Sequence, residues 1–210
     1  MSGDLSLDDL ERDALTEVVN IGVSRAAASL RKMVGQQVLL SVPAVEIVTH
    51  KAAAALIGQR ESEDLVAVRQ DFQGAFSGRA LLIFPETRSL ELVRAVVGDD
   101  IAAEDLPELE TEALSETGNI ILNNCLGTMA NMLQRSLKMS LPEVMRGRGD
   151  DLFIKPSGEG EGLVLFLYIN FSVRDRNIRG YIAMLMDLPS LAALKVLIAD
   201  FITRVTAGVD

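Results

Sequence analysis

Two stretches of the chain place a carboxylate and a carboxamide one helical turn apart. In the first, Asp13, Glu17 and Asn20 stand at i, i+4 and i+7, so on a helix they share one face. In the second, Glu116 and Asn119 repeat the Glu-x-x-Asn spacing. A carboxamide can orient water, because its oxygen accepts and its nitrogen donates hydrogen bonds. Each pair could therefore position water for hydrolysis if a partner molecule supplies the reacting phosphoryl group.

The residue types restrict the chemistry further. A carboxylate and an amide alone cannot form a nucleophilic triad. Two carboxylates could cleave glycosides, but that reaction needs an enclosed cleft, which an exposed helix face does not provide. The chain contains one cysteine, Cys125, and one histidine, His50, which excludes a cysteine- or histidine-rich metal site. We therefore expect no metal site and no cofactor of the protein's own.

Apolar periodicity predicts the two helices that carry these residues. The first is expected from Leu7 to about Met33 and the second from Pro107 to about Leu137. Glu112 and Asn123 extend the polar stripe of the second helix. Each stripe lies beside an apolar one, so we expect it to face solvent or a partner.

Internal similarity indicates that one unit occurs twice. Residues 17–21 align with residues 116–120 at an offset of 99, and Pro43 aligns with Pro142 at the same offset. Residues 78–84 match residues 180–186 at an offset of 102. We therefore expect residues 1–210 to form a single domain of two homologous halves, about 7–98 and 107–208, joined by an acidic stretch.

The order of elements in each half predicts the fold class. Each half reads as long helix, strand, connection, strand, turn, strand and helix. Hairpins favour antiparallel pairing, and strands that are apolar on both faces favour covering helices. We expect an α+β fold, in which the pseudo-two-fold repeat forms a six-stranded, largely antiparallel sheet flanked by two long motif-bearing helices and shorter helices. The predicted strands are 38–48, 65–72, 76–84, 139–144, 163–173 and 181–186.

The repeated motif resembles the signature of the CheC-type response-regulator phosphatases of chemotaxis (CheC, CheX and FliY), and is most similar to CheC. That signature is Asp or Ser, three residues, Glu, two residues, Asn, twenty-two residues and Pro. The matching positions are Asp13, Glu17, Asn20 and Pro43 in the first copy and Glu116, Asn119 and Pro142 in the second. A solvated helix face would explain either copy alone, but two copies in register favour a functional site.

The resemblance implies an enzyme that hydrolyses the aspartyl phosphate of a response-regulator receiver domain, phospho-CheY or a similar protein. Asn20 and Asn119 would position the attacking water, and Glu17 and Glu116 would contact the active-site lysine of the receiver. The receiver would carry the Mg2+. The implied supporting residues are Asp13, Pro43, Glu112 and Pro142. A CheD-like deamidase is a further partner that the family implies.

Two departures from the family pattern distinguish the copies. Glu112 stands where the pattern has Asp or Ser, and Val19 stands where relatives usually have glycine. We expect the β-branched Val19 to crowd the first site (Glu17 and Asn20), so the second site (Glu116 and Asn119) ranks above it. The alternative is a catalytically silent scaffold like the central domain of the flagellar switch protein FliM.

Composition sets the remaining expectations. The 210-residue chain has a formal net charge of −10, which makes it a poor partner for nucleic acid or an anionic membrane surface. The first residues show no basic and apolar signal-peptide pattern, and no apolar run is long enough to insert in a membrane. We expect a cytoplasmic protein and, because the repeat already supplies a pseudo-dimer, a monomer.

Overall fold

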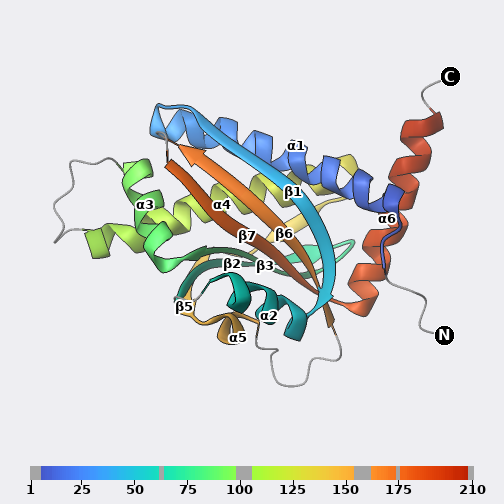
Figure 1. Ribbon diagram of the computed structural model, residues 1–210. Coiled ribbons are helices and arrows are strands. Elements are labelled where there is room, and N and C mark those ends of the chain that lie inside the picture. Colours follow the sequence, from blue (N-terminus) through green and yellow to red (C-terminus); the bar gives the residue numbers. More distant parts are fainter. Residues whose placement is uncertain (1–5, 62–63, 98–105, 154–161, 174–175, 208–210) are drawn as a thin grey trace.

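The computed structural model describes residues 6–61, 64–97, 106–153, 162–173 and 176–207. Helices and strands are interspersed along these residues (Figure 1). In chain order they are α1 (Asp9–Val34), β1 (Val38–Thr49), α2 (His50–Arg60), β2 (Leu65–Gly74), β3 (Gly78–Pro85), α3 (Glu86–Val97), α4 (Leu106–Met132), β4 (Leu137–Met139), β5 (Glu143–Gly147), α5 (Gly149–Leu152), β6 (Gly162–Val173), β7 (Arg176–Asp187) and α6 (Leu188–Ala207).

Local signals set the ends of the two long helices. A capping box between Asp8 and Glu11 begins α1, and Gly35, in the left-handed conformation with φ 68°, ends it. Helix α4 ends at Met132 and not near Leu137, so the predicted end was wrong. Gln134 takes a positive φ of 55°, which turns the chain out of the helix before the next strand begins.

The strands form one antiparallel sheet, as predicted. Its order is β1-β6-β7-β3-β2-β4, and β5 also pairs with β2. Strands β4 and β5 pair with different parts of β2, so the seven strands occupy the six places that were predicted. The single strand predicted over 139–144 is divided between β4 and β5. Pro142 lies in the gap between these strands and has no N–H to donate to a ladder.

The strand order reads the same from either edge when the elements of the two halves are exchanged. In that exchange β1 corresponds to β4 and β5, β2 to β6, and β3 to β7. This arrangement is compatible with a pseudo-two-fold axis between β3 and β7. The homology of the halves stays a prediction, and most of the predicted joint, residues 98–105, lies outside the described residues.

Helices cover both faces of the sheet. Helices α1, α3, α4 and α6 share the larger apolar core with one face, whereas α2 and α5 pack in a smaller core on the other (Figure 1). The motif helices α1 and α4 touch: a Cβ added to Gly22 would lie 2.9 Å from the Cα of Cys125. Among the described helices, none is long and apolar enough to span a bilayer.

Candidate functional site

The motif carboxylates project from the helix surfaces. Asp13 and Glu17 are exposed on α1, and Glu112 and Glu116 are exposed on α4. None of the four forms a hydrogen bond or ion pair with the part of the chain that the structure describes. The predicted polar stripes therefore do face outward, and their charge is available to a binding partner.

The side chain of Asn20 is hydrogen-bonded to the neighbouring strand, β1. Its Nδ2 donates to the backbone oxygen of Val42 at 3.1 Å, and its Oδ1 accepts from the backbone nitrogen of Val42 at 2.9 Å. The carboxamide thus pairs with one residue of β1 as another strand would. One lone pair and one N–H of the carboxamide remain for other groups.

Pro43 explains why Val42 needs this partner. The register between β1 and β6 shifts between Ser41 and Ala44, so Val42 and Pro43 are left out of the ladder. Buried backbone groups require hydrogen-bond partners, and Val42 is 2% exposed. Asn20 supplies both partners, so in the first copy of the motif Asn and Pro are parts of one bulge.

The expected crowding by Val19 is wrong. Val19 lies in the apolar core that α1 shares with the sheet and is 0% exposed, so it faces away from Glu17. Its counterpart Gly118 is also buried, and there a Cβ would come within 2.5 Å of the Val68 side chain on β2. The glycine thus allows close helix–strand contact in the second half and does not open the site.

Asn119 has different partners from those of Asn20. Its Oδ1 accepts hydrogen bonds from Gln70 Nε2, at 3.2 Å, and from Asn123 Nδ2, at 2.5 Å. Gln70 Nε2 also donates to the backbone oxygen of Ser140 at 2.9 Å. The Nδ2 of Asn119 donates to no described residue, so the second site presents an unoccupied amide N–H group.

The orientation of these amides follows from one unambiguous acceptor. The backbone oxygen of Ser140 can only accept, so the Gln70 atom beside it must be the nitrogen. The Asn119 atom that faces this nitrogen must then be the oxygen, and Asn123 must present its nitrogen to it. Two donors saturate the two lone pairs of the Asn119 oxygen.

The segment before Pro142 also differs from its counterpart in the first half. Leu141 corresponds to Val42 at the offset of 99 but is 85% exposed. Its neighbour Ser140 is held to β2, since its N–H donates to Asp71 O at 2.8 Å and its Oγ accepts from Asp71 N at 2.9 Å. Leu141 is therefore an exposed apolar side chain on a fixed backbone beside the second site.

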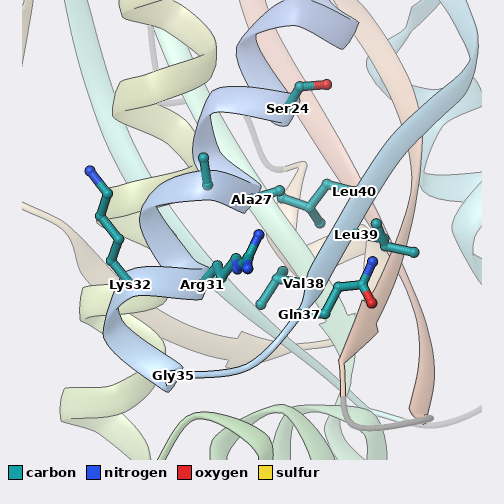
Figure 2. Close-up of a pocket in the computed structure, with 10 residues that line it drawn as sticks. Ser24, Ala27, Arg31, Lys32, Gly35, Gln37, Val38, Leu39 and Leu40 are labelled. Atoms are coloured by element: carbon teal, nitrogen blue, oxygen red, sulfur yellow. The ribbon is translucent and has the colours of Figure 1, made fainter.

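The first site opens into a groove between α1 and β1. Glu17 and Asn20 line a hollow of about 370 Å³, which shares Ser24 and Ala28 with a larger hollow of about 720 Å³. Figure 2 shows residues of α1 and of the start of β1 around the larger hollow, with Arg31 beside Val38 and Lys32 directed away from β1. The larger hollow has cationic and apolar lining residues and no carboxylate.

The structure keeps the two motif copies apart. Asn20 contacts β1 at one edge of the sheet, whereas Asn119 contacts β2, next to the other edge. Sequence reasoning missed Gln70. Its signal was present, because Val66, Val68 and Phe72 alternate toward the core and Gln70 interrupts that pattern with a polar group.

Two family models match the chain, and each match contains one copy of the motif. The CheC-like family model matches residues 10–47, which include Glu17 and Asn20. The model for the chemotaxis phosphatase CheX matches residues 66–166, which include Glu116 and Asn119. The chain therefore resembles the CheC-type family at both copies of the motif.

Curated relatives agree with this resemblance to the CheC-type family. The flagellar motor switch phosphatase FliY of Bacillus subtilis is 25% identical over 140 residues, 66% of this chain and 36% of that protein. The CheY-P phosphatase CheC of B. subtilis is 26% identical over 137 residues, 64% of this chain and 65% of that protein. The matched region thus spans about a third of one relative and just under two thirds of the other.

Solved structures share the fold of this chain. The crystal structure of Thermotoga maritima FliY superposes with a TM-score of 0.71 at 17% identity, covering 93% of this chain and 98% of that one. The FliM middle domain from Vibrio alginolyticus superposes with a TM-score of 0.62 at 11% identity, covering 87% and 99%. These structures establish the α+β architecture. The activity has to be argued from the residues of the site.

Proposed function

We propose that this protein hydrolyses the aspartyl phosphate of a CheY-like receiver domain. In this proposal Asn119 positions the attacking water and Glu116 binds the receiver. The observation that carries the proposal is the amide of Asn119, whose oxygen is saturated and whose Nδ2 has no partner among the described residues. Similarity to a relative named as a CheY-P phosphatase, and to another named as a flagellar motor switch phosphatase, supports the choice of substrate.

The proposed step is an in-line displacement at phosphorus. Asn119 Nδ2 donates to the oxygen of a water molecule and holds it opposite the aspartyl oxygen, while the other lone pair of that water attacks phosphorus. The new bond joins the water oxygen to phosphorus, and the bond from phosphorus to the aspartyl oxygen breaks. The aspartate leaves as a carboxylate with the bonding electron pair, and the water proton remains on inorganic phosphate or passes to solvent.

The receiver supplies the other charges in this proposal. Its Mg2+ and active-site lysine neutralise the phosphoryl oxygens, so the phosphatase needs no metal of its own. Glu116 pairs with that lysine and fixes the approach of the receiver, while Glu112 adds negative charge one turn away. Pro142 fixes the backbone beside the site. In this proposal the protein acts in the cytoplasm.

Glu17 and Asn20 form the second candidate pair. Asp13 extends their exposed face, but Asn20 bonds to Val42 in the bulge at Pro43. The first site can use Asn20 only through its remaining N–H and lone pair or after release from Val42. We therefore assign the larger share of the rate to the second site.

The decay of a radiolabelled phospho-CheY-like receiver in Mg2+, with and without the protein, tests the proposal. The protein should shorten the phosphoryl lifetime, and Asn119→Ala should lower this acceleration about 10- to 100-fold. Asn20→Ala should lower it less. Asn131→Ala is the matched control, because Asn131 is exposed near the end of the same helix, and it should leave the rate unchanged.

Two outcomes would contradict the proposal. If the double variant Asn20→Ala, Asn119→Ala accelerated decay as fast as the parent protein, the amides would have no role in hydrolysis. If the parent protein bound the phosphorylated receiver without shortening its phosphoryl lifetime, the FliM-like scaffold function would replace the enzyme.

A further inference from the structure

Gln70 is a polar residue in an apolar environment. It is 1% exposed and lies on the core-facing side of β2, in line with Val68 and Phe72. Its Nε2 bridges two oxygens, Asn119 Oδ1 at 3.2 Å and the backbone oxygen of Ser140 at 2.9 Å. Its Oε1 is buried and has no hydrogen-bond partner.

Stability alone does not explain this residue. A buried carbonyl oxygen without a donor is unfavourable, because it has lost its water and gained no partner. An apolar side chain of the same size would avoid that loss at this position and would extend the apolar face of β2. The two bonds made by Nε2 are what distinguish Gln70 from such a side chain, and one of them ends on the motif amide.

We propose that Gln70 is a positioning residue for Asn119. It holds the carboxamide with the oxygen toward the protein and the NH2 group outward, as a donor for the oxygen of a water molecule or a phosphoryl group. Because Gln70 also bonds to Ser140, it joins Asn119 to the backbone segment that carries Leu141 and Pro142. The inference rests on the proposed function and adds to it the group that keeps the amide of the second site in one orientation.

The first site has no equivalent of this arrangement. There the backbone of Val42 fixes Asn20 and occupies both ends of its amide. At the second site, the fixing group binds only the oxygen, and Asn123 provides the second donor. The nitrogen is thereby held in place without being occupied, which is the arrangement that a donor to substrate requires.

Gln70→Met tests the role in catalysis, because Met keeps the shape of Gln and removes the amide. At saturating concentrations of phosphatase, this variant should hydrolyse the phospho-receiver about tenfold more slowly. Its Kd for the beryllofluoride-activated receiver should stay within about twofold, since Gln70 is not on the surface. Gln73→Met is the matched control, because Gln73 is exposed on the same strand, and it should change neither value.

A double-mutant cycle shows whether Gln70 acts through Asn119. In the Asn119→Ala background, Gln70→Met should cause no further loss of rate. If it lowered the rate by the same factor in both backgrounds, Gln70 would act independently of Asn119 and the inference would be overturned. The thermal unfolding midpoint of Gln70→Met should stay close to that of the wild type, so that unfolding does not account for the loss.

The mobility of the Asn119 amide separates this inference from the proposed function. The 15N relaxation of Asn119 Nδ2, assigned from its absence in Asn119→Ala, should indicate a rigid group in the wild type and in Gln73→Met, and a mobile one in Gln70→Met. If the wild type failed to shorten the phosphoryl lifetime but showed this change, the phosphatase proposal would fail and the contact would stand. If the wild type were active while Gln70→Met kept full rate and a rigid Asn119, positioning by Gln70 would be refuted.

Discussion

The carboxamide of Asn20 and the backbone of Val42 bond to each other in both directions. The donor–acceptor distances are 3.1 Å and 2.9 Å, and the pair lies where Pro43 interrupts the pairing of β1 with β6. Asn20 therefore has a structural role in addition to its candidate role in catalysis. In the second half, Asn119 accepts hydrogen bonds from two side-chain donors, and its nitrogen has no partner among the described residues.

We expect Asn20→Ala to destabilise the protein more than Asn119→Ala does. Loss of Asn20 leaves the buried N–H and oxygen of Val42 without partners, which should lower the free energy of unfolding by about 2 kcal/mol. Loss of Asn119 leaves Gln70 Nε2 still bonded to Ser140, and the expected decrease is below about 1 kcal/mol. Urea denaturation measures both, and equal losses would contradict the structural role of Asn20.

The exposed Glu116 should affect binding of the receiver more than the hydrolytic step. Glu116→Gln removes a charge that has no partner among the described residues, so the fold should be unaffected. We expect the Kd for an activated receiver to rise about fivefold at low salt and less at high salt, because salt screens exposed charges. Glu112→Gln, one turn away, should have a smaller effect. A fall in the maximal rate with an unchanged Kd would instead place Glu116 in the chemical step.

Close packing at Gly118 should make this position intolerant of a side chain. In Gly118→Ala the new Cβ would lie 2.5 Å from Val68, which forces α4 away from β2 and should lower the free energy of unfolding by about 1–3 kcal/mol. Gly127 on the same helix is the control, since its Cβ would meet nothing within 4 Å. Gly127→Ala should stabilise the helix by about 0.5–1 kcal/mol. Chemical denaturation of both variants would show whether packing or helix propensity determines the change in the free energy of unfolding at each glycine.

Cys125 should be unreactive in the folded protein. Burial raises the pKa of its thiol to about 12, so the thiolate that reacts with a disulfide reagent is scarce. We expect no reaction with Ellman's reagent at pH 8 until the protein is unfolded in urea. Rapid modification of the folded protein would show that α1 and α4 separate readily.

The same thiol should make stability depend on pH in alkaline solution. Its pKa is raised on folding, so its contribution is fully present below the pKa of the unfolded thiol, about 8.5, and is lost as the pH rises toward the folded value. The difference in unfolding free energy between wild type and Cys125→Ala should therefore shift against the wild type by up to about 1.4 kcal/mol per pH unit above 8.5. A constant difference from pH 8 to pH 11 would contradict this.

The sequence was informative where local spacing decides the structure. The periodicity of Leu15 and Val18 and the polar stripe of Glu17 predicted which face of α1 is buried and which is exposed, and the structure confirms both. Hairpin signals predicted the β2–β3 and β6–β7 pairs. Pro142 divided one predicted strand into β4 and β5, because a missing N–H interrupts a ladder in a way that hydrophobicity does not reveal.

Contacts between distant elements could not be predicted in the same way. Asn20 meets Val42 only because α1 and β1, which share the larger apolar core, pack against each other. Val19 was expected beside the first site, but a shift of one residue on a helix turns a side chain by about 100° and placed it in the core. Gln70 and Asn119 are 49 residues apart, and only the register of β2 under α4 brings them together.

The strand order has a consequence for synthesis of the chain. The pairs between β1 and β6 join residues more than a hundred positions apart, such as Thr49 and Leu163. At a synthesis rate of about 5–20 residues per second, β1 leaves the ribosome roughly 5–25 seconds before β6, its neighbour among the described strands, has been made. During that time Asn20 can already close onto Val42. The nascent chain would thus hold β1 against α1 while the rest of the sheet is still being made.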